Sequence, residues 1–565
     1  MASSNFSQKE TEGDYFYEES EATDFLIPPI ERGRVNLFFV LVFLISLFFL
    51  GKVFYLQFPK GSYYKEVAEG NRLRIEKIRA NRGLIYDANG KSLVKNRTEF
   101  YSVKMPEEKI IDKRIPYEEA LKMMTSGSKE VKVRIEPKRE YLGGEAFSHL
   151  LGFCGKISKE ELSSNLGKEN YDLTDSIGKD GLELYYEKIL KGEDGKQKIE
   201  VDPKGNEKKI LNEEPAYDGK DITLSLDSDL QKKAEEAFRR YAGKNAKGAV
   251  VIMDPRNGQV LSLLSFPTYD NNSLNNEQFW QKLSTDKNSP LINRAIAGLY
   301  PSGSIIKPVI ALGALEEGLI DNETTVLSTG GIKIGKWFFP DWKPSGHGRV
   351  NLVDALSWSI NTFFYYIGGG YEGFEGLGPE KINFYLKSVG LGEKTGIDLP
   401  NEKAGFVPSK EWKEKTRNEP WYIGDTYNLS IGQGDLLVTP LQVANYTAAI
   451  ANGGTLFEPS ILKDSSKIIK EKIFKKENID LVKLGLRAVV TRGSAQSLSS
   501  LGISVAGKTG TAQVEGASPH AWFTGFAPYP NPQIVITVLI ENGGKGSNLA
   551  VKITKEILQY YFNLL

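Results

Sequence analysis

The sequence predicts an α+β fold: one antiparallel sheet of about five strands with helices on both sides, in the C-terminal part of a 565-residue chain. Two observations lead to this fold class. Residues 248–253 and 259–265 are apolar runs joined by a turn that contains Pro, Asn and Gly, which indicates a β-hairpin. A long, mainly helical stretch follows, and the chain closes on three strand-like runs, 503–514, 521–528 and 533–541, and an apolar helix at 549–565.

The composition is that of a globular protein and argues against several classes of function. Lys and Arg balance Asp and Glu to a formal net charge of +0, so nothing favours nucleic acid as a partner. The three histidines are far apart, and Cys154 is the one cysteine. This spacing predicts neither a metal site nor an intramolecular disulfide, and no motif predicts a cofactor.

An apolar segment near the N-terminus predicts a membrane anchor. Residues 35–50 carry no charge, and the apolar character resumes after Lys52 and continues to Leu56, which is long enough to cross a bilayer. The main alternative is a cleaved signal peptide, but a long acidic tail precedes the segment and no small-residue cleavage site follows it. We therefore expect a disordered tail at 1–34 and an uncleaved single-pass anchor at 35–56; the flanking basic residues leave its orientation open.

The composition and the hydrophobic pattern of the remaining chain change near residue 220. Residues 57–220 are rich in Lys and Glu and hold no constellation around a nucleophile, so we expect a scaffold or interaction domain there. Within it, residues 81–90 predict a strand that ends in an Asn-Gly turn. A strand at 222–226 and a helix at 229–241 then open a second domain, residues 221–565.

A serine and a lysine three residues apart form the first chemical motif. Ser304 and Lys307 follow a Gly-containing turn, and a helix beginning near residue 305 would place the lysine within reach of the hydroxyl. This geometry suits a nucleophile beside its activating base. The pattern alone is weak, because the same spacing also begins at Ser62, Ser92, Ser126, Ser176, Ser284 and Ser460.

Two further motifs in the same predicted domain single out Ser304. Ser359-Ile360-Asn361 follows a helix-like stretch at 350–358, and Lys508-Thr509-Gly510 lies inside the strand-like run 503–514. Each motif has copies elsewhere, including Lys394-Thr395-Gly396 in a loop. Only one set has the right order, the right local structure and a shared domain, and this coincidence makes the signal strong.

Together these motifs resemble those of class B penicillin-binding proteins, serine D,D-transpeptidases that cross-link peptidoglycan. Segments outside the motifs are also similar to this family. Arg82-Gly83, with Asp87 and Gly90, resembles its N-terminal signature, so residues 57–220 would be its pedestal, or dimerisation-type, domain and residues 221–565 its penicillin-binding domain. Five segments resemble the elongation-type subgroup, penicillin-binding protein 2: 341–343 (Asp-Trp-Lys), 346–348 (Gly-His-Gly), 424–426, 430–434 and 439–442.

The resemblance implies that Ser304 carries the acyl group. Lys307 would take the proton of the Ser304 hydroxyl, which requires a lysine that is partly deprotonated at neutral pH. Burial would lower the pKa of Lys307, and so would a second cation, Lys508, a few ångströms away. The pair of lysines would thus supply the base for the reaction.

The resemblance also implies how the substrate binds. Ser359 would relay a proton between the lysines and the leaving amine, and Asn361 would hydrogen-bond the backbone of the donor peptide. Thr509, Gly510 and Thr511 would bind the substrate, because the missing side chain at residue 510 lets an extended peptide lie along the strand edge. The backbone N–H groups of Ser304 and Thr511 would form the oxyanion hole.

Partners and a location follow from the same resemblance. The substrates would be stem peptides of lipid-linked nascent glycan, β-lactams would acylate the same serine, and a polytopic glycan polymerase would be the protein partner. Because wall precursors are cross-linked outside the cytoplasmic (inner) membrane, the tail would be cytoplasmic and the catalytic domain periplasmic. Three alternatives stay open: a division-specific class B transpeptidase, a β-lactam-binding sensor and a β-lactamase.

Four residues outside the motifs have an ordinary structural interpretation beside a functional one. His347, between two glycines, is expected to be a loop residue, with a role in the substrate cleft as the alternative. Trp522 and Phe523 could line the cleft, but aromatic residues in strands are more often core. Cys154 is expected to be a small buried hydrophobe.

Overall fold

The computed structural model describes residues 32–104, 113–126, 131–163, 171–202 and 207–564, so most of the predicted tail lies outside the described residues. The chain divides into two compact units. The first consists of residues 1–76 with 198–212, and the second of residues 77–197 with 213–565.

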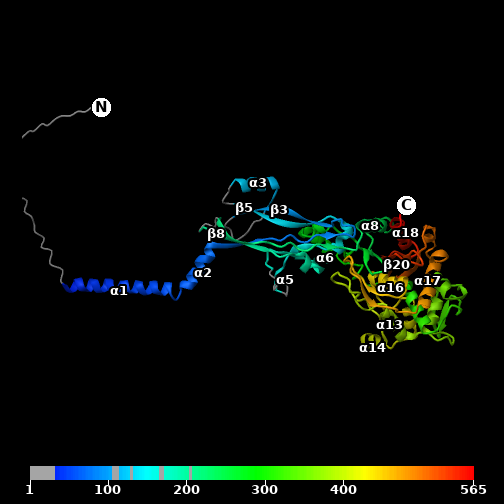
Figure 1. Cartoon of the computed structure of the whole chain (residues 1–565). Coiled ribbons are helices and arrows are strands. Elements are labelled where there is room, and N and C mark those ends of the chain that lie inside the picture. The colour runs from blue at the N-terminus through cyan, green and yellow to red at the C-terminus, as the bar shows by residue number, and fades with distance from the viewer. Residues whose placement is uncertain (1–31, 105–112, 127–130, 164–170, 203–206, 565) are drawn as a thin grey trace, which may run out of the picture. The chain divides into compact units, whose positions relative to one another are not determined.

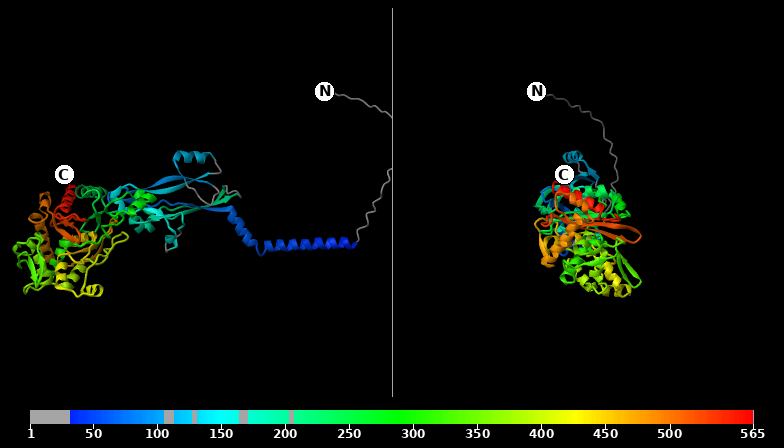
Figure 2. Two further views of the ribbon diagram at one scale, coloured as in Figure 1. Left: turned by 180° about the vertical axis from the view of Figure 1, so that it is seen from behind. Right: turned by 90° about the vertical axis from the view of Figure 1, so that its right-hand side faces the viewer.

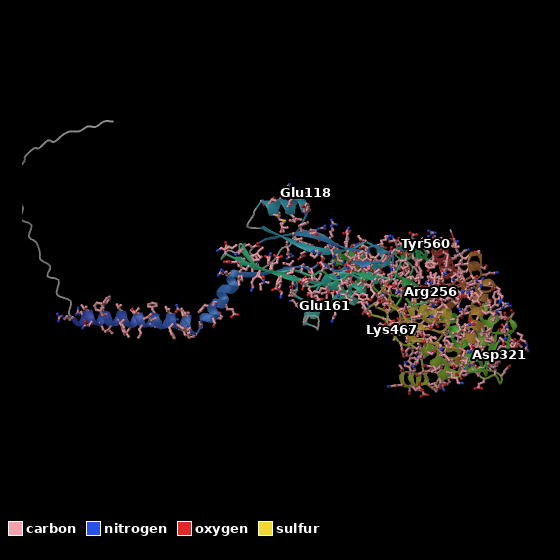
Figure 3. All side chains as sticks on the ribbon, in the orientation of Figure 1. Glu118, Glu161, Arg256, Asp321, Lys467 and Tyr560 are labelled. Carbon is pink, nitrogen blue, oxygen red and sulfur yellow. The ribbon has the colours of Figure 1, made fainter. Side chains whose placement is uncertain are left out.

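The first unit contains the predicted membrane anchor. Helix α1 (Arg32–Gln57) is 26 residues long and apolar enough to cross a membrane, and none of its side chains is buried. These side chains project from every side of the helix (Figure 3). The unit also contains α2 (Gly61–Arg72) and most residues of a three-stranded sheet in the order β1-β8-β9, formed by β1 (Leu73–Ile78), β8 (Gly195–Val201) and β9 (Glu207–Glu214).

The N-terminal part of the second unit, up to residue 223, is built from short elements around one longer strand pair. Strand β3 (Val94–Lys104) lies between β4 (Lys113–Ile115) and β5 (Val131–Tyr141) in an antiparallel sheet. Strands β2 (Ile85–Tyr86) and β10 (Ile222–Thr223) pair in parallel. Strand β10 is shorter than the predicted 222–226 because Leu224 pairs instead with Leu462. The other elements are α3 (Tyr117–Thr125), α4 (Ser148–Leu151), β6 (Cys154–Lys156), α5 (Lys159–Ser163), β7 (Ser176–Gly178), α6 (Gly181–Tyr185) and α7 (Glu187–Leu190).

The rest of the second unit contains the predicted five-stranded antiparallel sheet, in the order β12-β11-β21-β20-β19. Its first two strands form the predicted hairpin, and the other three come from the end of the chain, as the sequence predicts. The strands are β11 (Gly248–Met253), β12 (Val260–Phe266), β19 (Ala506–Val514), β20 (Ala517–Ala527) and β21 (Ile534–Ile540). Strand β19 is at one edge of the sheet, so one side of it is open to other partners.

Helices cover both faces of this sheet. Helices α8 (Ser228–Ala242) and α18 (Leu549–Tyr561) pack on one face and α16 (Pro440–Asn452) on the other, as Figures 1 and 2 show. Because side chains alternate along a strand, Phe523 packs in the core beneath α8 and α18, and Trp522 packs in the core on the opposite face. Both rings are fully buried, so they are core residues.

The insertion between β12 and β19 supplies most of the residues around the predicted nucleophile. Two short antiparallel pairs, β13 with β16 and β14 with β15, stand beside its helices. The elements are α9 (Glu277–Ser284), η4 (Gly303–Ile306), α10 (Lys307–Glu316), β13 (Val326–Ser328), β14 (Gly331–Ile334), β15 (Trp337–Pro340), β16 (Gly348–Val350), α11 (Leu352–Ser357), α12 (Asn361–Gly369), α13 (Gly378–Ser388), α14 (Lys410–Arg417), α15 (Ile423–Ser430), β17 (Leu456–Glu458), β18 (Lys467–Lys470) and α17 (Lys476–Thr491).

Candidate active site

Ser304 lies in a short 3-10 helix and not at the start of an α-helix. The structure differs from the predicted helix near residue 305, because η4 comes first and α10 begins at Lys307. Pro308 lies in the first turn of α10, where a missing N–H has no helical partner to lose. The Ser304 side chain is partly exposed while its neighbours Ile305 and Ile306 are buried, so the hydroxyl can be reached by a substrate.

Close contacts fix η4 against the edge strand β19. Gly303 has φ +54°, and a Cβ at this position would lie 2.8 Å from Thr511 O, so both the conformation and the contact require glycine. The Gly303 N–H donates to Gly432 O at 2.8 Å, and Trp522 Nε1 donates to Pro301 O at 3.2 Å. The segment before the nucleophile is therefore tied to the sheet and to the loop after α15.

Lys307 is fully buried and holds the second motif by hydrogen bonds. Its Nζ donates to Ser359 O at 2.8 Å, to Ser359 Oγ at 3.3 Å and to Asn361 Oδ1 at 2.7 Å. Burial lowers the pKa of Lys307 to about 7, and the negative charge of Asp341 opposes this shift. Among the described residues, Ser304 Oγ makes no hydrogen bond to Lys307, and such contacts often form only when substrate is bound.

Lys508 is the second buried cation of the site. It lies on β19 with its Nζ donating to Thr509 O at 2.9 Å, and it is fully buried. Burial lowers the pKa of Lys508 well below its usual range, and the charge of Lys307 lowers it further. From the sequence we expect both burial and Lys508 to lower the pKa of Lys307. In the structure, burial is the main cause of the lowered pKa of both lysines, and their mutual repulsion adds to it.

Ser359 and Asn361 lie in a tight turn between α11 and α12. Ser359 has φ +56°, in the left-handed region that L-residues rarely adopt, and its side chain is partly exposed. Asn361 is the first residue of α12. The strained turn aims the Ser359 hydroxyl and the Asn361 side chain at the same lysine.

In the third motif Thr509 and Gly510 are packed, whereas Thr511, the next residue, is exposed. The Thr509 hydroxyl lies 2.6 Å from Ser494 Oγ, and its side chain is buried. A Cβ at residue 510 would lie 2.8 Å from Ile305 Cγ2, so this glycine is needed for the packing of η4 on β19, a reason that the sequence argument misses. Thr511 is exposed, and its Oγ1 accepts from Gly546 N at 3.4 Å.

The second copy of the Lys-Thr-Gly triplet, residues 394–396, has a separate structural role. Both the N–H and the hydroxyl of Thr395 donate to Glu402 Oε1, at 2.7 and 2.6 Å. Glu402 also accepts from Gly396 N at 3.1 Å. These bonds close a loop, and the triplet lies outside any strand, so only Lys508-Thr509-Gly510 joins the lysine–serine cluster.

Sequence reasoning did not give a site role to several residues that the structure places at the site. Asp341 faces Lys307, and the other such residues are Trp342 and Ser494. The His347 ring packs at a tilt against Trp342 with ring centroids 5.1 Å apart, and burial lowers the pKa of His347. Within the described residues, no group of three or more His, Cys, Asp or Glu side chains could hold a metal ion.

This fold and these motifs define a serine transpeptidase of the penicillin-binding class. The family model "Penicillin binding protein transpeptidase domain" matches residues 248–559, and "Penicillin-binding Protein dimerisation domain" matches residues 102–224. The peptidoglycan D,D-transpeptidase MrdA of Haemophilus influenzae is 32% identical over 594 residues, which cover 90% of this chain and 88% of its own.

Two solved structures show the same relationship. The penicillin-binding protein PBP2 of Helicobacter pylori, in complex with MreC, superposes with a TM-score of 0.77 at 31% identity, covering 87% of this chain and 100% of its own. A chain of a peptidoglycan synthase complex that coordinates polymerization and crosslinking superposes with a TM-score of 0.75 at 28% identity. The match covers 94% of this chain and 99% of the other. The chain belongs to the PBP2 (MrdA) family of class B peptidoglycan D,D-transpeptidases.

Proposed function

We propose that the protein cross-links peptidoglycan stem peptides through an acyl-enzyme on Ser304. The observation that carries this proposal is the buried cluster in which Lys307 Nζ contacts both Ser359 and Asn361 beside Lys508 on the edge strand. The family relationship supplies the substrate class. Nothing else in the cluster is needed to start an acyl transfer, because a nucleophile, a base and a strand edge for the donor peptide are present.

In the acylation step, Ser304 Oγ attacks the carbonyl carbon of the penultimate D-alanine. Lys307 accepts the hydroxyl proton, since a pKa of about 7 leaves about half of these lysines neutral at neutral pH. The bond to the terminal D-alanine breaks, and that amine leaves with a proton delivered through Ser359. The N–H groups of Ser304 and Thr511 stabilise the oxyanion, each by about 3 kcal/mol.

In the second step, an amine of a neighbouring stem peptide attacks the ester on Ser304. The new amide bond forms as the ester bond to Oγ breaks, and the proton lost by the amine returns to Ser304 through Lys307. Thr509, Gly510 and Thr511 hold the donor along β19 during both steps. A β-lactam acylates the same serine and leaves it slowly.

Labelling with a fluorescent penicillin tests this assignment on the full-length protein in detergent. We expect a stable covalent adduct that disappears in Ser304→Ala. The matched control is Ser284→Ala, which removes the serine of another Ser-x-x-Lys pair, on α9. An adduct that persists in Ser304→Ala contradicts the assignment, and rapid release of the drug indicates a β-lactamase.

The elongation role is supported by the MrdA relatives and is separable from division in cells. Depletion of the protein should make rod-shaped cells round, because side-wall growth then stops. Filamentous cells would instead identify a division-specific transpeptidase.

The resemblance to the synthase complex supports a polytopic glycan polymerase as partner, with α1 as one contact. Exchange of α1 for an unrelated single-pass helix should keep penicillin labelling and abolish co-purification with the polymerase. Retention of the polymerase by this chimera would contradict the role of α1.

A catalytic domain outside the cytoplasmic membrane is tested by thiol labelling of intact spheroplasts. Lys467→Cys places a thiol on an exposed residue (Figure 3), and a membrane-impermeant maleimide should modify it. The native Cys154 gives no background because it is buried, and burial raises the pKa of its thiol to about 12. Modification only after lysis would place the domain in the cytoplasm.

A further inference from the structure

The turn that carries Ser359 needs support from outside itself. A serine at φ +56° is in an unfavourable backbone conformation, and such residues persist only when surrounding contacts over-determine them. Helix α12, which starts directly after this turn, has Ile360 at its N-cap, a residue whose side chain cannot cap a helix. Both features imply that groups outside the turn hold it in place.

One short segment, Pro340–Trp342, contacts the turn at both of its ends. On the N-terminal side, Trp342 Nε1 donates to Trp358 O at 2.9 Å. On the C-terminal side, Asp341 Oδ2 accepts from Thr362 N at 2.9 Å and from Thr362 Oγ1 at 2.8 Å. Residues 358 and 362 directly flank Ser359–Asn361.

The segment is itself held in place, so it can act as a fixed support. The Asp341 N–H donates to Gly330 O at 2.8 Å, and the Trp342 N–H donates to Asp341 Oδ1 at 2.8 Å. The Trp342 ring packs against His347. Asp341 is only 5% exposed, so its carboxylate is a buried cap at the N-terminus of α12, where a negative charge is favourable.

We propose that Pro340–Trp342 is a clamp that positions the Ser359–Asn361 turn for acyl transfer, with Asp341 and Trp342 as positioning residues. This inference rests on the proposed function and extends it. The turn supplies all three acceptors of Lys307 Nζ, so a shift of the turn moves the Ser359 hydroxyl and the base together. Asp341 and Trp342 therefore affect catalysis indirectly, through the turn that they hold in place.

Asp341 has a second effect on the same base. Its carboxylate raises the pKa of Lys307, against the lowering by burial. The other charged or titratable groups that face this region are Lys508 on β19, His347 and Lys343 in the loop before β16, and Tyr365 on α12. Removal of the Asp341 charge should lower the pKa of Lys307, which predicts a change in pH dependence that loss of structure alone would not give.

The first test removes one bond of the clamp by Trp342→Phe in the full-length protein in detergent. Trp342 is 57% exposed, so this variant should fold. We expect the acylation rate constant with a fluorescent penicillin to fall about 3–10-fold at saturating drug, the usual effect of one lost hydrogen bond. The matched control is Trp337→Phe on β15, an equally exposed tryptophan with no hydrogen bond to the turn. Equal rates in the two variants would overturn the clamp.

The second test is the pH profile of acylation in Asp341→Asn, from about pH 5 to about pH 9. We expect a plateau about tenfold lower and an acid limb that moves to lower pH. The control Asp321→Asn changes an exposed aspartate (Figure 3) and should keep the wild-type profile. An unmoved acid limb in Asp341→Asn overturns the inference. If the wild-type protein forms no penicillin adduct at all, the proposed function fails first.

Discussion

Two clusters of buried charge in the second unit differ in how their charges are paired. In the N-terminal cluster (Arg82, Arg139, Glu183 and Glu187), Glu183 receives Arg82 Nε at 2.5 Å and Arg139 Nε at 2.6 Å, and Arg82 also reaches Glu187 at 2.6 Å. In the catalytic cluster (Lys307 and Lys508), both lysines are fully buried, and among the described residues neither forms an ion pair.

Whether a buried charge has a partner of opposite sign decides the direction in which its pKa shifts. Burial alone would raise the pKa of Glu183, but the charges of Arg82 and Arg139 outweigh it, so its pKa is below the usual value. Burial lowers the pKa of Lys307 to about 7 with only Asp341 opposing. Paired charges thus stay ionised and hold the fold together, whereas an unpaired buried lysine can become a base.

The largest expected effect is the loss of the base. Lys307→Met keeps the apolar stem and removes the amine, so penicillin acylation should fall about 10²–10⁴-fold. The control Lys463→Met removes the lysine of another Ser-x-x-Lys pair and should acylate at the wild-type rate. Stopped-flow acylation measures both, and a loss below about tenfold in Lys307→Met would show that another group accepts the proton.

The next effect is on stability and belongs to the N-terminal cluster. Glu183→Gln leaves the buried Arg139 without a carboxylate and Arg82 with one fewer, so the free energy of unfolding should fall by about 3–5 kcal/mol. Denaturant titration of the full-length protein measures this loss, with the exposed Glu236→Gln as the control. An unchanged midpoint would show that the network is not needed for the fold.

Lys307→Met and Glu183→Gln should change the free energy of unfolding in opposite directions. Lys307→Met removes a buried cation that the unfolded chain would solvate, so this variant should be more stable than the wild type by roughly 1–4 kcal/mol at neutral pH. The sign follows from linkage. Because the folded pKa of Lys307 is below its unfolded value of 10.5, folding releases protons between about pH 7 and pH 10, and wild-type stability rises with pH in that window. A destabilised Lys307→Met, measured by the same titration, would contradict this account.

The sequence could predict the sheet and the motif cluster because both rest on local patterns. The hairpin turn at 254–258 and the three C-terminal apolar runs mark the five strands, and the coincidence of three short motifs in one domain marks Ser304 and Lys307. It could not show that η4 is a 3-10 helix, because that depends on the contact of Gly303 with Thr511 across more than 200 residues. The bonds of Asp341 and Trp342 to the turn span only 21 and 16 residues, but they too form only in the folded chain and follow from no local pattern.

The protonation states of Lys307 and Lys508 could not be predicted from the sequence either. The resemblance of the motifs to the penicillin-binding family implies that Lys307 and Lys508 meet, but the extent to which burial lowers the pKa of Lys307 depends on the packed structure. Sequence reasoning therefore reached the right pair and named both burial and Lys508 as causes of the lowered pKa of Lys307, and the structure shows that burial is the larger one.

The smallest expected effect separates those two causes. Lys508→Ala opens the wall around Lys307 to water and removes a like charge, and both changes should raise the pKa of Lys307 toward its usual value. Since a higher pH is then needed to deprotonate the base, the acid limb of acylation should move to higher pH, with a loss of about tenfold at neutral pH that shrinks as the pH rises. Lys508→Met refills the space without the charge. If burial sets the pKa of Lys307, Lys508→Met should keep the wild-type acid limb. If the acid limb instead moves equally in Lys508→Ala and Lys508→Met, the charge of Lys508 sets the pKa of Lys307.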